Sequence, residues 1–332
     1  RLFLPTMSYA ISFLQRQLTG KLPIPTASFQ GKTVIVTGSN IGLGLETSRW
    51  VVHLGASRVI LACRNISKGL AAAKDIQATT GCSSDTLDVW ELDMGSYSSV
   101  QAFSTKVKTE LPRLDVLIAN AGINSHAFQL VEDNEAMITI NVVSLFLLGF
   151  LLYPKLRETA AKYETQTHFT TTSSDLHEIA KFDEHKAPLG QIFAALNDET
   201  KFSAMDRYPT SKLLEIIVVK QLATLLPLDS NNVIISCVSP GMCQSELTRE
   251  FSNFVVRFVQ NIIGRTTEVG SRSIVHGASS GGESHGQYLP DCKIERPRGL
   301  FQGDKGDEIQ SNVWEELKGK LEAIQPGVTT VS

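Results

Sequence analysis

Short runs of aliphatic and β-branched residues alternate with longer amphipathic segments from residue 33 to about residue 290. This alternation predicts parallel strands joined by helical crossovers, because each buried strand is followed by a helix that covers one face of the sheet. We therefore expect an α/β fold, a doubly wound parallel sheet of the Rossmann type in a single domain. The expected strands cover residues 33–36, 58–61, 86–92, 116–119, 168–173, 233–238 and 287–289, and the expected helices include 43–54 and 313–324.

Three parts of the chain fall outside this alternation and suggest its organisation. Residues 1–30 form an N-terminal extension, and residues 31–292 form the core domain, with a polar insertion at 175–207. Residues 293–332 form a C-terminal extension that ends in a helix with one apolar face. A chain of 332 residues with 42% hydrophobic and 20% charged residues is ample for a large buried core.

Composition excludes several classes of protein. A net charge of -3 gives no general attraction for phosphate backbones, so we expect no nucleic-acid partner. The five cysteines are scattered without C-x-x-C spacing, which indicates neither a disulfide framework nor a zinc site. His177 and His185 have no partners at ligand spacing, so we predict no metal. The cysteine pattern favours a reducing compartment, and we expect a cytoplasmic protein.

Two apolar stretches raise the question of membrane contact. Neither reaches the roughly 20 uninterrupted residues that span a bilayer. Residues 145–156 follow polar Asn141 and Ser144 closely, so they favour a core or subunit-contact helix. The stretch near the N-terminus is broken by Pro5, and a peripheral membrane helix in residues 1–20 stays open as an alternative.

The sequence TGSNIGLG, residues 37–44, follows the first predicted strand directly. In a strand, turn and helix arrangement, Gly38 permits the tight turn, Gly42 lets backbone N–H groups approach a pyrophosphate, and Gly44 lets helix and strand pack closely. The helix N-terminus then faces the anion with unpaired N–H groups and a positive dipole end. A structural loop could use similar residues, but the position after a first buried strand favours a dinucleotide site. Its predicted members are Gly38, Ser39, Asn40, Ile41, Gly42, Leu43 and Gly44.

Arg64 follows the second predicted strand, at the position where dinucleotide-binding folds contact the ribose of the cofactor's adenosine. An acidic residue there would accept a hydrogen bond from a 2′-hydroxyl and repel a 2′-phosphate, whereas arginine binds the phosphate. Arg64 therefore predicts NADP(H), with a solvated surface arginine as the alternative.

Five motifs in register resemble the short-chain dehydrogenase/reductase superfamily over residues 31–292. They are TGSNIGLG, NAG at 120–122, TTSS at 171–174, YPTSK at 208–212 and SPG at 239–241. Within the superfamily, GKTVIVTGSNIGLGLE, VILACRN and LDVLIANAGI most resemble the retinol-dehydrogenase-like reductases, and the tail VWEELKGKLEAIQPG is similar to fungal relatives. The resemblance implies an NADP(H)-binding catalytic domain.

The residues of these motifs also suggest a chemistry. Tyr208 and Lys212 are four positions apart, so on a helix they share one face, and the ammonium would lower the phenol pKa toward a working range. Ser174 would donate a hydrogen bond to a carbonyl oxygen, and strand alternation together with the family pattern favours it over Ser173. Asn141 matches the asparagine with which the family holds a water linked to the lysine, although a buried helix-capping asparagine is an alternative.

The resemblance implies the remaining cofactor contacts. Asp93 would meet the adenine amino group, NAG would line the adenosine side, and the SPG segment would pass beside the nicotinamide. The chain departs from the family pattern after this segment, since PGMCQSEL lacks the usual threonine, and Ser245 takes the amide contact in its place. These implied contacts are Asp93, Asn120, Ala121, Gly122, Tyr208, Lys212, Pro240, Gly241, Cys243 and Ser245.

These expectations combine into a function. We expect an NADP(H)-dependent oxidoreductase that reduces a ketone or aldehyde, or oxidises the matching alcohol, with Tyr208 as the acid/base. The insertion should border the active site, and residues 242–265 could form a lid over a bulky apolar or aromatic substrate, with a core helix as the alternative. The fungal resemblance favours a polyketide-type secondary metabolite as substrate.

Alternative functions and the assembly stay open. An inactive NADPH-binding sensor is one alternative, and a retinoid or steroid dehydrogenase at a membrane surface is another. The spacing of the glycine turn disfavours a sugar-nucleotide epimerase. We expect only a small-molecule carbonyl or alcohol substrate as ligand besides the cofactor. A homodimer or homotetramer would pair through the helices that carry Asn141 and Tyr208, as relatives commonly do.

Overall fold

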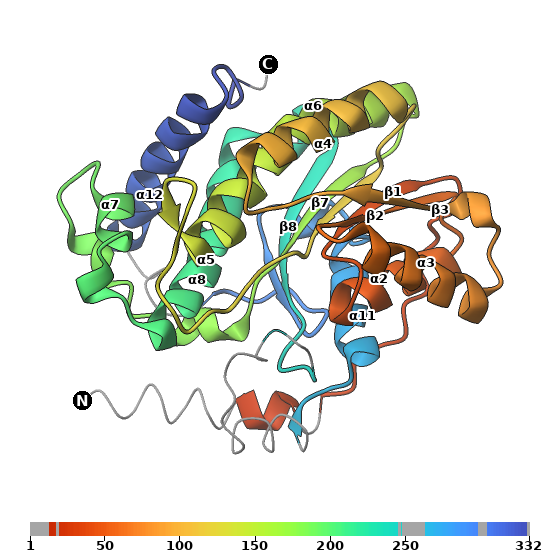
Figure 1. Cartoon of the computed structure of the whole chain (residues 1–332), viewed down its shortest axis with the longest axis horizontal. Coiled ribbons are helices and arrows are strands. Elements are labelled where there is room, and N and C mark those ends of the chain that lie inside the picture. The colour runs from red at the N-terminus through yellow and green to blue at the C-terminus, as the bar shows by residue number, and fades with distance from the viewer. Residues whose placement is uncertain (1–12, 18–19, 245–246, 248–262, 298–303, 331–332) are drawn as a thin grey trace.

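A parallel seven-stranded sheet forms the centre of the molecule (Figure 1). The computed structural model describes residues 13–17, 20–244, 247, 263–297 and 304–330. The strand order β3-β2-β1-β4-β7-β8-β9 runs outward in both directions from the β1/β4 pair, which makes the sheet doubly wound. The strands are β1 (Thr33–Thr37), β2 (Arg58–Cys63), β3 (Leu87–Glu91), β4 (Val116–Ala119), β7 (Thr167–Thr172), β8 (Val233–Ser239) and β9 (Tyr288–Pro290).

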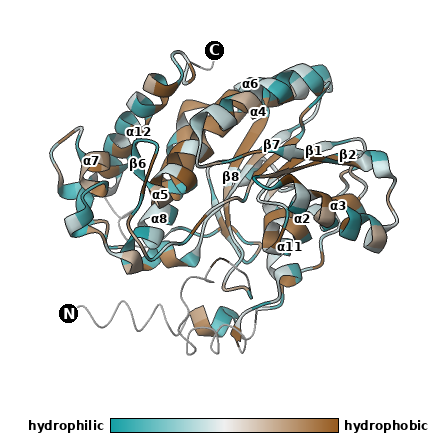
Figure 2. Cartoon of the chain, in the orientation of Figure 1, coloured by the Kyte–Doolittle hydropathy of each residue, from teal (hydrophilic) through white to brown (hydrophobic). Residues whose placement is uncertain are grey.

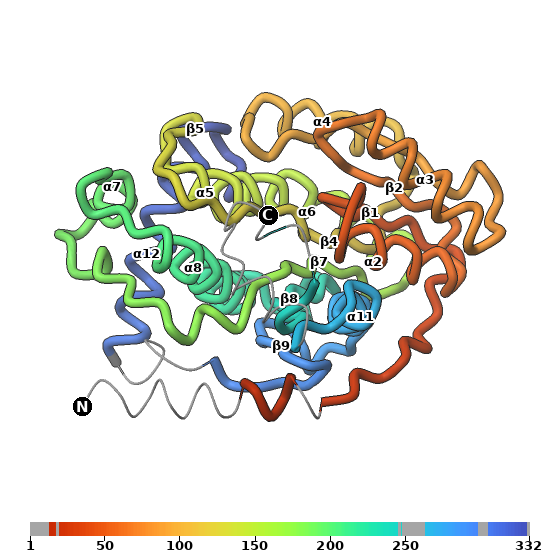
Figure 3. The backbone as a smooth tube through the Cα atoms, turned by 60° about the horizontal axis from the view of Figure 1, so that its bottom comes forward, coloured from red at the N-terminus to blue at the C-terminus, as the bar shows by residue number. Residues whose placement is uncertain are grey.

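Helices cover both faces of this sheet (Figures 1 and 3). One face carries α2 (Gly42–His53), α3 (Ile66–Thr80) and α11 (Thr267–Gly277). The other carries α4 (Tyr97–Glu110), α6 (Ser144–Lys162) and α8 (Ala204–Leu225). The smaller elements and the last helix are the β5 (Leu130–Val131) and β6 (Asn134–Glu135) hairpin, α5 (Ala136–Ile138), α7 (Ile192–Leu196), α9 (Leu228–Asn231) and α12 (Asp304–Ile324).

The apolar strand residues build two separate cores. In β1, Ile35 belongs to the core beneath α4, α6 and α8, whereas Val34 and Val36 belong to the core beneath α2, α3 and α11. Successive side chains of a strand point to opposite faces, and both faces of this sheet are covered, so all five residues of β1 are buried. This is why central strands such as β1 and β4 carry uninterrupted apolar stretches, residues 34–36 and 116–119, and Figure 2 shows brown segments within the sheet.

The sequence predictions of fold class and strand positions are confirmed. The observed strands begin and end within a few residues of the predicted ranges, and α2 matches the helix expected at 43–54. The last helix begins at Asp304 rather than Val313, because its first turns are polar and lack the apolar stripe used to predict it. The β5–β6 hairpin was not predicted, since its two-residue strands are too short to show alternation.

The apolar segment near residue 145 is a core helix. Among the described residues, one continuous helical stretch, Ala136–Lys162, is long and apolar enough to cross a membrane, and 94% of its apolar window is buried inside the protein. The C-terminal helix α12 packs against α8 and α6, with Trp314 stacked on Phe150 at a ring distance of 5.7 Å. The C-terminal extension therefore covers part of the two helices expected to pair between subunits, and the oligomeric state stays a prediction.

Candidate active site

The glycine turn has the geometry that its sequence predicts. Gly38 and Gly42 adopt φ angles of 66° and 61°, a region that residues with side chains seldom enter. A β-carbon at Gly38 would lie 3.0 Å from the Ala121 α-carbon, and one at Gly44 would lie 2.6 Å from Asn120 Nδ2. The turn therefore packs directly against the NAG segment, and a larger residue at either position would force them apart.

The N-terminus of α2 presents free donors at this turn. Its N-cap residue, Ile41, makes no side-chain hydrogen bond to the first turn. A β-carbon at Gly42 would meet no atom within 4 Å, so there is open space beside the first residue of α2. The buried hydroxyl of Ser39 finds no partner among the described residues. Open backbone donors at a helix N-terminus, with an unpaired hydroxyl beside them, fit the phosphates of a dinucleotide.

The neighbouring strand tips carry the residues predicted for the adenosine end. Arg64 follows β2, and its exposed side chain forms no ion pair with the described residues. Asp93 follows β3 and accepts a hydrogen bond from the Gly95 N–H at 2.9 Å. Both residues thus lie at the carboxyl edge of the sheet, after the two strands on the outer side of β1, and their contacts with a cofactor stay a prediction.

Thr37 was quoted in the glycine motif, but its role was missed. Its hydroxyl oxygen accepts hydrogen bonds from the N–H groups of Asn120 at 3.0 Å and Ala121 at 2.9 Å. Asn120 Nδ2 donates to the Thr37 carbonyl at 3.0 Å. These bonds join the ends of β1 and β4, the pair from which the strand order diverges, and this is where doubly wound sheets bind ligands. A polar residue at the end of a fully buried strand was the available signal.

The acid/base candidates lie side by side on α8. Tyr208 and Lys212 are 5% and 4% exposed, and Lys212 Nζ lies 5.7 Å from the centre of the Tyr208 ring. Burial raises the pKa of Tyr208, while Lys212 and a hydrogen bond with Ser174 oppose that rise. The predicted lowering by Lys212 is present, but burial outweighs it in the structure.

The two serines of the TTSS motif have different environments. Ser173 is buried and donates to the Lys212 carbonyl at 2.8 Å, so it fastens β7 to α8. Ser174 is partly exposed, accepts from the Leu176 N–H at 3.2 Å and is hydrogen-bonded to Tyr208. This arrangement supports Ser174 over Ser173 as the residue that contacts a carbonyl oxygen.

Asn141 lies in a π-helical turn, Thr139–Val143, at the start of the long apolar helix. Its Nδ2 donates to the Ile123 carbonyl and to Ser211 Oγ, each at 3.0 Å, and its Oδ1 accepts from the Ile123 N–H at 2.9 Å. A β-carbon at Gly122 would lie 3.1 Å from Asn141 Oδ1 and 3.5 Å from Lys212 Nζ. The structure thus brings Asn141, Gly122 and Lys212 together, with Asn141 also supporting the backbone after the NAG motif.

The segment after β8 completes this edge of the site. Gly241 has a φ of 72°, and a β-carbon there would lie 2.8 Å from Arg265 Nη1. Cys243 is buried, and burial raises the pKa of its thiol to about 12, so the sulfur stays neutral. Ser245 lies outside the described residues, as does most of the predicted lid over 242–265.

The N-terminal extension contacts the rim of the site, which the sequence did not indicate. Gln17 Nε2 donates to the carbonyls of Met242 at 2.6 Å and Ile263 at 3.0 Å, and its Oε1 accepts from the Met242 N–H at 3.3 Å. Arg16 pairs with Asp175 at 3.4 Å, and Asp175 also accepts from the Tyr288 hydroxyl at 2.7 Å. Residues 13–17 therefore hold the segments that follow strands β7 and β8, next to Ser174 and Gly241.

The insertion at 175–207 packs into the protein rather than onto it. Phe182, Ile192 and Phe193 are buried, as their apolar character predicted, whereas Leu189 is 77% exposed. At its end, the fully buried Arg207 approaches Glu184 of the insertion at 3.1 Å and Glu135 of β6 at 3.8 Å. The residue before Tyr208 thus anchors the insertion beside the acid/base pair.

Another residue that sequence reasoning missed is Glu215. Its Oε1 lies 2.6 Å from Lys212 Nζ, and its side chain is completely buried. Lys212 also donates to the Thr172 carbonyl at 2.9 Å. The i,i+3 spacing in KLLE was a signal for such a pair, but the same spacing is common on solvated helix faces.

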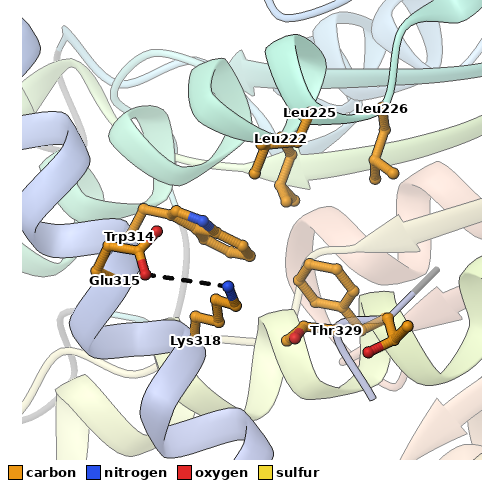
Figure 4. Close-up of a pocket in the computed structure, with 9 residues that line it drawn as sticks. Leu222, Leu225, Leu226, Trp314, Glu315, Lys318 and Thr329 are labelled. Atoms are coloured by element: carbon orange, nitrogen blue, oxygen red, sulfur yellow. Dashed lines mark ion pairs between the residues drawn. The ribbon is translucent and has the colours of Figure 1, made fainter. Parts of the chain in front are cut away.

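A groove of about 370 Å³ lies away from these residues, between α6, α8 and α12 (Figure 4). Its lining includes Phe150, Leu222, Trp314 and Lys318. Leu222 lies near the end of α8 opposite to Tyr208, so the groove is separate from the acid/base pair. The described residues contain no group of three histidine, cysteine or acidic side chains that could hold a metal ion.

Comparison with known proteins agrees with this geometry. A family model described as short chain dehydrogenase matches residues 32–162. The chain is 48% identical over 322 residues to the short chain dehydrogenase/reductase dmxR8 of Cryptosporiopsis sp. (strain 8999), covering 96% of this chain and 99% of that protein. It is 38% identical over 328 residues to the short-chain dehydrogenase anuD of Penicillium roqueforti (strain FM164), covering 96% and 85%.

A solved structure shows the same fold. That structure is of a short chain dehydrogenase from Shigella flexneri complexed with NADP, with a TM-score of 0.58 and 19% identity, covering 81% of this chain and 100% of that chain. The similarity to the fungal relatives extends over nearly the whole chain. The chain therefore belongs to the short-chain dehydrogenase/reductase family.

Proposed function

We propose that this oxidoreductase uses NADPH to reduce a ketone or aldehyde on a bulky apolar or aromatic compound of fungal secondary metabolism. The observation that carries the proposal is the position of Ser174, Tyr208 and Lys212 at one sheet edge, next to the glycine turn. An acid, a hydrogen-bond donor and a fixed cation beside open phosphate-binding donors are the groups that carbonyl reduction needs.

The protein residues would share the work as follows. When bound, NADPH supplies the hydride that the carbonyl carbon receives. Tyr208 Oη donates its proton to the carbonyl oxygen, and Ser174 Oγ donates a hydrogen bond that stabilises the charge developing there. Lys212 places a positive charge beside the phenol and, from this position, can also hold the nicotinamide ribose. The oxidation of the matching alcohol uses the same residues in reverse.

The cofactor choice rests on Arg64. Its exposed guanidinium at the end of β2 is free to bind a 2′-phosphate with charge-assisted hydrogen bonds. The NADP complex of the Shigella flexneri relative supports the same choice. The contacts proposed for NADP(H) are residues 38–44, Arg64, Asp93, residues 120–122, Tyr208, Lys212, Pro240, Gly241, Cys243 and Ser245.

The substrate class and setting are also part of the proposal. The named relatives come from fungi and are not specifically retinol dehydrogenases, which favours a secondary metabolite over a retinoid or steroid. No disulfide joins the five cysteines, all of which lie within the described residues; this suits a reducing compartment, and we propose a cytoplasmic enzyme. Flotation with lipid vesicles, with and without residues 1–20, would separate this from the membrane-surface alternative.

The test follows NADPH and NADH absorbance with aromatic ketones, quinones, retinal and steroid ketones. We expect NADPH to be consumed with one class of bulky carbonyl compound. Arg64→Ala should raise the KM for NADPH about 10- to 100-fold, the loss of hydrogen bonds to a charged group, and leave the KM for NADH unchanged. Lys74→Ala, which removes an exposed charge farther along α3, is the control. Binding of NADPH without turnover of any compound would favour the sensor alternative.

A further inference from the structure

Glu215 is a buried charge at the catalytic lysine that no family motif accounts for. It lies on α8, three positions after Lys212, and its side chain has no solvent exposure. One carboxylate oxygen lies 2.6 Å from Lys212 Nζ, and the other finds no partner among the described residues. An isolated buried carboxylate is costly, so Glu215 is retained here as the partner of the ammonium.

The pair formed by Lys212 and Glu215 lies close to a small number of other titratable groups. On α8 itself, Lys212 lowers the pKa of Glu215, and Glu215 raises the pKa of Tyr208. From β8, Cys237 faces it, and burial together with Glu215 raises the pKa of that thiol to about 12, so the thiol is neutral. β7 contributes the Thr172 carbonyl, which accepts from Lys212 at 2.9 Å. Glu215 therefore supplies the negative charge within this set.

The two charges act on Tyr208 with opposite signs. Lys212 lowers the pKa of the phenol, because a neighbouring cation stabilises phenolate, and Glu215 raises it. Burial raises the pKa of Glu215 itself to about 7, against the attraction of Lys212, so the carboxylate is charged above that pH. A lysine with a charged partner at 2.6 Å thus has a weaker net effect on the phenol than an unpaired lysine would.

We propose that Glu215 is a positioning residue that fixes the Lys212 ammonium and partly neutralises it, so that Tyr208 keeps its proton to higher pH than it would beside an unpaired lysine. Reduction needs a phenol that holds its proton, whereas oxidation needs phenolate to accept one. This inference rests on the proposed function and adds to it the residue that sets the pH range of the acid/base.

Glu215→Gln separates charge from shape, because glutamine keeps the volume and an oxygen that can accept from Lys212. Without the negative charge, Lys212 acts on the phenol unopposed, so phenolate forms at lower pH. The alkaline limb of the reduction profile and the acidic limb of the oxidation profile should then both move to lower pH. We expect both limbs to move by about one pH unit, as for removal of one buried charge, while the ratio of kcat/KM for the two directions at any one pH stays set by the equilibrium constant.

The direct measurement is the phenolate absorbance of Tyr208 as a function of pH, taken as the difference between each protein and its Tyr208→Phe counterpart. It needs no substrate, so it tests the inference even if the proposed reaction is wrong. The expected result is a titration at lower pH in Glu215→Gln than in the wild type. Glu158→Gln removes a half-exposed carboxylate that pairs with Lys155 in the same i,i+3 geometry, and it should leave the titration in place.

Folding is the remaining concern, because Glu215→Gln leaves Lys212 buried without a counter-charge. Lys212→Met/Glu215→Gln removes both charges, and its titration is compared with that of Lys212→Met alone. The same shift to lower pH is expected in this background. An unchanged titration, or one moved to higher pH, in either folded comparison would overturn the inference.

Discussion

Two buried cations on α8 lie only five positions apart, yet they have different kinds of partners. Arg207 is 1% exposed and pairs with Glu184 of the insertion and with Glu135 of β6. Lys212 is 4% exposed and pairs with Glu215 of its own helix and with the Thr172 carbonyl of β7. The first joins segments distant in the sequence, whereas the second keeps a charge beside Tyr208. Burial of a charge therefore does not by itself identify chemistry, and the origin of the partner distinguishes the two roles.

The surroundings of Arg207 fit a structural role. Glu135 also accepts hydrogen bonds from the N–H groups of Met137 at 3.1 Å and Ile138 at 3.3 Å, so it caps α5. The guanidinium lies 5.9 Å from the centre of the Phe202 ring, within the insertion. Arg207 thus connects three segments around the start of α8, and its effect on the reaction is through the position of Tyr208.

The largest effect on activity is expected at Lys212. Lys212→Met removes the charge beside the phenol, and kcat/KM should fall about 10²- to 10⁴-fold, the range of acid/base assistance. The Tm should fall less than it does in Arg207→Met, because Lys212→Met leaves one carboxylate without its cation and Arg207→Met leaves two. Kinetics and thermal melts of the same preparations would measure both. An equal decrease of Tm in the two variants would contradict the proposed difference between Lys212 and Arg207.

The largest effect on stability is expected at Arg207. Arg207→Met leaves Glu135 and Glu184 without a cation, and removal of one partner of a buried pair lowers the free energy of unfolding by about 3–5 kcal/mol. Denaturant unfolding measures this value. At a temperature where the variant is folded, kcat should change less than in Lys212→Met. Lys201→Met, which removes an exposed charge of the same insertion, is the control. A variant as stable as the wild type but inactive would assign chemistry to Arg207 instead.

Most of the fold could be predicted from the sequence because the sheet is buried on both sides. The centre of β1, residues 34–36, and all of β4 then consist of apolar residues without a break, and they stand out against the amphipathic helices. The first turns of α12 and the β5–β6 hairpin lack such a pattern. The hairpin, for example, depends on contacts with a distant residue, since Asn197 Nδ2 donates to the Asp133 carbonyl and its Oδ1 accepts from the Glu135 N–H.

In the candidate site, too, some residues could be predicted from the sequence and others could not. Gly38 belongs to the glycine turn, and Tyr208 and Lys212 are four positions apart in another short motif, so the spacing within each motif was enough to select them. Gln17 and Glu215 could not be found in this way. Gln17 reaches backbone groups more than 200 positions away in the chain, and the importance of Glu215 depends on its complete burial.

The measurement that most directly tests the central claim compares wild type and Tyr208→Phe in the consumption of NADPH with a ketone or aldehyde that the wild type reduces. The account predicts a rate lower by about 10²- to 10⁴-fold in Tyr208→Phe, because the proton donor is lost, with NADPH still bound. A Tyr208→Phe protein that reduces the same compound as fast as the wild type would contradict the account.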